Sequence, residues 1–118
     1  MNVFRLKNTI QEYVWGSPTL IPSLLGTVNP EGVPKAEMWM GTHSKAPSVA
    51  LDENGETPLP DLIEGDPQGL LGESVAGRFD GKLPFLFKIL AADQALSIQA
   101  HPNLTQARAG YELSLIHI

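Results

Sequence analysis

Apolar and polar residues alternate along this chain in short runs, and a Pro or Gly residue lies close to the end of most of them. Alternation with a period of two predicts half-buried strands rather than amphipathic helices. An Asn-Gly pair at 54–55 predicts a tight turn after the run that ends at Leu51. The predicted strands span residues 3–6, 36–43, 48–51, 83–91 and 95–100.

Signals for helices are equally short. Ser17 before Pro18, and Asp66 before Pro67, each combine a capping side chain with a proline at the first helical position. Asn103 provides the capping side chain of a further helix. The predicted helices span residues 18–25, 61–65, 66–79 and 103–112. Short strands without long alternating helices favour a mainly β fold, an antiparallel barrel or jelly roll with short helical additions.

Composition narrows the class of protein further. A chain of 118 residues forms one small domain or part of a larger one. Its formal net charge of −5 and its 8 scattered Lys and Arg residues argue against binding to nucleic acid. No apolar run approaches the roughly 20 residues that span a bilayer, and no signal peptide is visible. We therefore expect a cytoplasmic protein that does not bind membranes, and any metal must have nitrogen and oxygen ligands because Cys is absent.

The last six residues, LSLIHI at 113–118, need a separate interpretation. The codons CTG TCT CTT ATA CAC ATC encode the same peptide, and they form a transposon-end adapter used in sequencing libraries. We therefore expect residues 113–118 to be a non-native tail and exclude His117 as a site candidate. The alternative is a natural edge strand, because the segment alternates passably.

The segment before Pro102 carries the chemistry. Alternate residues of a strand face the same side, about 6.5–7 Å apart between Cα atoms. Ser97, Gln99 and His101 would then share one face and leave an apolar face to pack on a core. An amide oxygen and an imidazole at this spacing suit zinc or a similar divalent ion. The alternative is the solvated outer face of an antiparallel strand.

Lys88 interrupts the apolar run FLFKIL, a predicted strand with apolar residues on both faces. Burial of an amine there is costly unless it has a partner or a function, although Lys88 could also extend from a sheet edge into solvent. If the last two predicted strands pair through an even-numbered connection, Lys88 lies opposite Gln99. A three-residue loop places it opposite Ile98 instead. The first pairing makes Lys88 a candidate general acid/base or a binder of an anionic group.

Four segments together carry a resemblance to a known family. They are YVWG at 13–16, AEMWMGTH at 36–43, LPFLFKIL at 83–90 and LSIQAHP at 96–102. In their order and spacing, the chain resembles the N-terminal part of the type I mannose-6-phosphate isomerases over essentially residues 1–112. The resemblance implies the first part of a cupin-type jelly-roll catalytic domain, whose barrel is incomplete here, with one zinc ion.

The resemblance also implies roles for individual residues. Gln99 and His101 match two of the family's zinc ligands, and the remaining Glu and His come from later segments that this chain does not contain. Lys88 is the candidate catalytic residue, as general base or as phosphate binder. Trp15, Ser97 and Lys88 are the candidate substrate-binding residues.

Other polar and aromatic residues near these motifs have two interpretations each. Trp15 and Trp39 could stack on a sugar, although Trp39 is more typical of a core residue. His43 could be a third metal ligand, but a hydrogen-bonded structural role suits it better. Glu37 could support the site or accept a backbone hydrogen bond, and Ser97 could form a cross-strand hydrogen bond.

The expected reaction interconverts mannose 6-phosphate and fructose 6-phosphate by proton transfer through an enediol. The family places this step in carbohydrate metabolism, toward GDP-mannose, and we expect a monomer. With two of the zinc ligands, the 118-residue chain is expected to be inactive by itself. The alternatives are a non-enzymatic sugar-binding or storage cupin, and a metal-free interaction domain if Gln99 and His101 face solvent.

Overall fold

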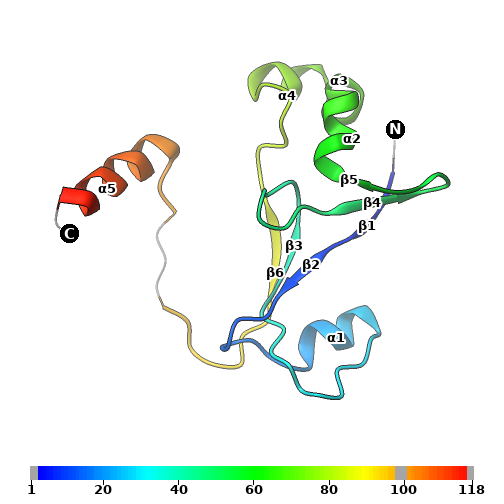
Figure 1. The fold of residues 1–118 in the computed structure, drawn as a ribbon, viewed down its shortest axis with the longest axis vertical. Coiled ribbons are helices and arrows are strands. Elements are labelled where there is room, and N and C mark those ends of the chain that lie inside the picture. The colour runs from blue at the N-terminus through cyan, green and yellow to red at the C-terminus, as the bar shows by residue number, and fades with distance from the viewer. Residues whose placement is uncertain (1–2, 98–100, 117–118) are drawn as a thin grey trace.

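Two small antiparallel sheets form the body of this protein (Figure 1). The computed structural model describes residues 3–97 and 101–116. One sheet has the order β1-β4-β5, and its strands are Arg5–Lys7, Val49–Asp52 and Gly55–Pro58. The other has the order β2-β3-β6, and its strands are Thr9–Gln11, Glu37–Met40 and Phe87–Leu90. Antiparallel sheets with helical additions are confirmed, but the described strands do not close a barrel.

Five helices accompany the sheets in the described part of the chain, and Figure 1 shows α5 lying away from both sheets. Their bounds are α1 Leu20–Leu25, α2 Leu59–Gly65, α3 Pro67–Leu71, α4 Glu73–Arg78 and α5 Leu104–Ile116. None of the described helices is both long enough and apolar enough to cross a membrane.

Two of the predicted helix starts are confirmed, at Asp66 and Asn103, whereas α1 begins at Leu20 with Thr19 rather than Ser17 at the N-cap position. The Ser17 hydroxyl accepts the backbone N–H groups of Thr19 and Leu20, each at 3.2 Å. The Asp66 carboxylate accepts the Gly69 N–H at 3.1 Å. Asn103 forms a reciprocal capping box with Gln106, in which each side chain accepts the backbone N–H of the other residue.

One predicted helix is wrong in its extent. Residues 66–79 form two helices, α3 and α4, rather than one. Gly72 lies between them at φ 84° and ψ 153°, a positive-φ conformation that interrupts the helix and that glycine adopts without steric cost. The chain therefore turns at Gly72 before α4 begins.

The prediction of a strand over residues 95–100 is wrong for residues 95–97, which belong to no strand, and residues 98–100 lie outside the described part. Directly after β6, residues 92 and 93 contact the aromatic turn at 13–16. Asp93 N–H donates to the Trp15 carbonyl at 2.8 Å, and Ala92 forms an isolated bridge with Gly16. Among the described residues, Lys88 lies opposite Trp39 of β3. Its predicted partners, Gln99 or Ile98, lie outside the described residues, so that pairing stays a prediction.

The core lies on one face of the β2-β3-β6 sheet. Met38 of β3 is 6% exposed and packs with Ile21 of α1 and Ala91, with Ile10 and Ile89 beside them. Because successive residues of a strand point to opposite faces, Glu37 and Trp39 must lie on the other face. The apolar face therefore anchors β3 and β6, and the polar face is free to line a site.

The end of the chain is helical. Residues 113–116 continue α5, so the alternative of an edge strand is wrong for them. Leu113 and Leu115 are exposed, but so is every described side chain of α5 before them. Exposure thus does not separate the two parts of the helix, and the adapter origin of residues 113–118 stays a prediction.

Candidate functional site

A cavity of about 410 Å³ lies on the polar face of the β2-β3-β6 sheet. The antiparallel register places Trp39 directly opposite Lys88, and Glu37 opposite Leu90. All four side chains line the cavity, so β3 and β6 form its floor. The complete lining is Tyr13, Trp15, Glu37, Trp39, Lys88, Leu90, Leu96 and Ser97.

The aromatic turn at 13–16 supplies one wall. Gly16 N–H donates to the Tyr13 carbonyl at 2.9 Å, which closes the turn, and the rings of Tyr13 and Trp15 lie 5.8 Å apart between centroids. The turn lies so close to β3 that a Cβ on Gly16 would lie 2.5 Å from the backbone nitrogen of Ala36. Only glycine allows this approach, which holds Trp15 over the cavity.

An ion pair and an indole define the electrostatics of the floor. Lys88 Nζ lies 3.5 Å from Glu37 Oε1 and 4.9 Å from the centroid of the Trp39 ring. Trp39 Nε1 donates to Glu37 Oε2 at 3.5 Å. The Glu37 side chain is 9% exposed and that of Lys88 33%, so the carboxylate is buried with its partners while the amine reaches the cavity.

The segment after β6 supplies the remaining wall. The hydrogen bond from Asp93 N–H to the Trp15 carbonyl ties this segment to the aromatic turn. Leu96 and Ser97 then reach the cavity, and Ser97 is exposed. Because Ser97 belongs to no strand, the interpretation as a cross-strand hydrogen bond does not apply to it.

The structure therefore brings together three of the five residues that the sequence selects, Trp15, Lys88 and Ser97, in one cavity. His101 is exposed and does not line this cavity. Gln99 lies outside the described residues.

The donor types of Gln99 and His101, an amide oxygen and an imidazole, suit zinc. The exposed imidazole of His101 is accessible to an ion. Among the described residues, no three His, Cys, Asp or Glu side chains gather around a possible metal position. The donor set thus fits part of a zinc site.

For several residues around the cavity, the sequence indicated an incomplete role or none. Trp39 is buried, as expected for a core residue, yet it also lines the cavity. Glu37 pairs with the Lys88 amine rather than with a backbone donor. Lys45 was not singled out, although its Nζ donates to the Tyr13 hydroxyl at 3.2 Å and lies 5.4 Å from the Trp39 ring centroid.

His43 has a structural role in this arrangement. Its Nδ1 accepts the Lys45 backbone N–H at 3.1 Å, and its ring packs edge-on against Trp39 with centroids 4.9 Å apart. These contacts support the interpretation of His43 as a hydrogen-bonded structural residue.

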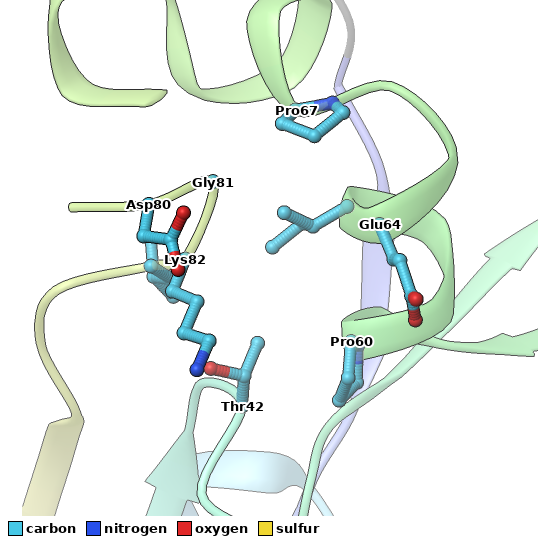
Figure 2. Close-up of a pocket in the computed structure, with 9 residues that line it drawn as sticks. Thr42, Pro60, Glu64, Pro67, Asp80, Gly81 and Lys82 are labelled. Carbon is cyan, nitrogen blue, oxygen red and sulfur yellow. The ribbon is translucent and has the colours of Figure 1, made fainter. Parts of the chain in front are cut away.

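A second cavity, of about 560 Å³, lies between α2 and the loop that follows α4 (Figure 2). Its walls include Ile63 and Pro67, and Figure 2 shows Lys82 extending toward Thr42 across it. None of the residues selected from the sequence lines this cavity. The candidate site is therefore the smaller cavity on the sheet.

Comparisons with known proteins find the same family that the four sequence segments resemble. Residues 3–114 match the family model of the phosphomannose isomerase type I catalytic domain. The chain is 50% identical over 108 residues to the mannose-6-phosphate isomerase of Salmonella typhimurium and 49% identical to that of Escherichia coli, in each case over 91% of this chain. It spans about 27% of the length of these two relatives. A crystal structure of zinc-bound mannose 6-phosphate isomerase superposes on 97% of the chain with a TM-score of 0.82 and 44% identity, and 29% of that structure is covered.

Proposed function

Because this chain belongs to the type I phosphomannose isomerase catalytic domain family, we propose that it forms the N-terminal part of a zinc-dependent aldose-ketose isomerase. The substrates are mannose 6-phosphate and fructose 6-phosphate, and the reaction moves a proton between C1 and C2 through an enediol. The observation that carries the proposal is the cavity that joins an ammonium, a hydroxyl and an indole from Lys88, Ser97 and Trp15. We further propose that the two sheets belong to a cupin-type jelly roll.

The cavity offers the groups that such a substrate requires. A sugar phosphate presents an anionic end, hydroxyl groups and an apolar ring face. Lys88 provides positive charge and Ser97 a hydrogen-bonding hydroxyl. The half-buried indole of Trp15 forms a wall on which a sugar ring can pack. Lys88 is thus a candidate for phosphate binding or for proton transfer.

Gln99 and His101 are the residues of this chain that would hold zinc. The bound ion would polarise the carbonyl and hydroxyl oxygens of the sugar as a Lewis acid. Because a catalytic zinc site uses about three protein ligands, the 118-residue chain by itself is expected to bind zinc weakly and to show no turnover.

A chimaeric enzyme tests the proposal. Residues 3–112 replace the matching segment of the Escherichia coli relative, and conversion of mannose 6-phosphate is measured with added zinc. We expect turnover that a chelator abolishes, and none from the 118-residue chain alone. A folded chimaera that binds zinc and sugar without turnover would instead support the non-enzymatic cupin. Turnover by the 118-residue chain would show that its zinc ligands are not Gln99 and His101.

A further inference from the structure

The ion pair on the cavity floor distinguishes between the two candidate roles of Lys88, phosphate binding and proton transfer. We infer that Glu37 is a positioning residue, which together with Trp39 holds Lys88 as a fixed ammonium group that binds an anionic oxygen of the substrate. Lys88 then does not serve as the general base. The inference rests on the proposed function for the nature of the substrate, a sugar phosphate.

Strand register explains why this arrangement is fixed. Trp39 and Lys88 are direct cross-strand neighbours in β3 and β6, and Glu37 is the diagonal neighbour of Lys88. Long side chains reach across such a diagonal, whose Cα separation is about 7–8 Å. The opposite face of both strands packs in the core through Met38 and Ile89, so the two backbones hold their positions.

Both oxygens of the Glu37 carboxylate are engaged, which prevents its free rotation. Oε1 lies 3.5 Å from Lys88 Nζ, and Oε2 accepts the Trp39 indole N–H at 3.5 Å. With 9% of its side chain exposed, Glu37 has little water to replace these partners. Loss of the amine would leave the carboxylate buried and unpaired, which is strongly unfavourable.

Two contacts hold the Lys88 ammonium group at the cavity floor. One is the carboxylate of Glu37, and the other is the face of the Trp39 indole 4.9 Å from Nζ. An ammonium group held in this way can bind an anionic oxygen, and it carries no free electron pair with which to accept a proton. The Lys88 side chain remains 33% exposed at the cavity, so the ammonium can still contact a ligand.

Kinetics of the chimaeric enzyme distinguish a cation from a base. Arginine keeps the charge and cannot give up its proton, so Lys88→Arg is expected to keep kcat within a few-fold. Lys88→Gln is expected to raise KM for mannose 6-phosphate about 10- to 100-fold, the range for loss of a charged hydrogen bond. Glu37→Gln is expected to raise KM less, and the double variant should be no worse than Lys88→Gln. Equal collapse of kcat in Lys88→Arg and Lys88→Gln would overturn the role as a cation.

A second measurement uses the 118-residue chain itself. The side-chain NMR signals of Lys88 are expected at upfield positions because of the Trp39 ring, and Glu37→Gln should move them toward free-lysine values. Glu56→Gln is the matched control, since it breaks a Lys7–Glu56 ion pair of the same 3.5 Å length that is exposed on the other sheet. Free-lysine shifts for Lys88 in the unsubstituted chain would overturn the positioning by Glu37. A chimaera without turnover would count against the proposed function, and the Lys88 signals would still decide the positioning.

Discussion

Gly16 and Ala36 approach each other so closely that a Cβ on residue 16 would lie 2.5 Å from the backbone nitrogen of Ala36 and 2.7 Å from its Cβ. This contact joins the aromatic turn to the strand that carries Glu37 and Trp39. Around it, Ala36 N–H donates to the Gln11 carbonyl, and Ala91 N–H donates to the Ala36 carbonyl at 2.8 Å. The packing of three chain segments thus depends on the missing side chain of one residue.

Gly16→Ala is therefore expected to destabilise the protein by about 1–3 kcal/mol, the range for overpacking a rigid interior. Urea unfolding measures the change. Gly77→Ala is the matched control, because Gly77 lies in α4 with no atom near the added methyl group. There the substitution is expected to be stabilising by roughly 0.5–1 kcal/mol. A neutral Gly16→Ala would contradict the close approach.

Ser48→Ala tests a buried hydroxyl between the two sheets. Ser48 Oγ donates to Asn8 Oδ1 at 2.7 Å and accepts the Gly41 N–H at 3.0 Å, and Ser48 is 0% exposed. Its loss leaves polar groups of both partners unsatisfied, so we expect a cost of about 1–3 kcal/mol. Thermal or urea unfolding checks it, with exposed Ser23→Ala in α1 as a control that should stay within about 0.5 kcal/mol. Equal stability of the two variants would show that the hydroxyl does not link the sheets.

The sequence predicted best those features that depend on local chemistry. The caps at Asp66 and Asn103 are side-chain bonds to backbone groups three residues away, so residue type alone specifies them. Short apolar runs between Pro and Gly residues placed strands around Glu37–Met40 and Phe87–Leu90, and Met38 and Ile89 of these strands pack in the core.

Pairing between distant segments could not be predicted in this way. The alternation of residues 95–100 indicated a hairpin with β6, yet residues 95–97 belong to no strand, and the partner of β6 among the described residues is β3, more than forty residues earlier in the chain. No local pattern in either segment specifies this partner. Lys88 and Ser97 were selected from strand patterns and Trp15 from a family motif. The cavity brings the three together through contacts of the 13–16 turn that local patterning does not contain.

Ligand binding can be followed through the two tryptophans, because both Trp15 and Trp39 line the cavity. Trp15 is half-buried at the wall, whereas Trp39 is 6% exposed beneath Lys88. Mannose 6-phosphate is therefore expected to change the fluorescence of the chimaeric enzyme mainly through Trp15. The change should persist in Trp39→Phe and disappear in Trp15→Phe. A response that depends only on Trp39 would remove Trp15 from the substrate-binding residues.

Zinc binding provides a test of His101. The 118-residue chain is expected to bind zinc weakly, since Gln99 and His101 supply two neutral ligands. His101→Ala should abolish this binding in a calorimetric titration. His43→Ala should retain it, because the His43 Nδ1 accepts the Lys45 N–H and its ring packs on Trp39. Loss of zinc binding in His43→Ala, with binding retained in His101→Ala, would show that His43 rather than His101 is a zinc ligand.

Removal of residues 113–118 tests whether the end of the chain belongs to the folded structure. Leu113 and Leu115 are more than half exposed, and the core lies around Met38 on the β2-β3-β6 sheet. Hydrophobic stabilisation follows the apolar area that folding removes from water. The truncated chain should therefore unfold at the same urea concentration as the full chain, with a change below about 0.5 kcal/mol. Met38→Ala, which empties a buried position, should in contrast cost about 2–5 kcal/mol. A loss of stability on truncation comparable to that of Met38→Ala would show that the last residues pack against the body of the protein, and it would count against their origin in an adapter.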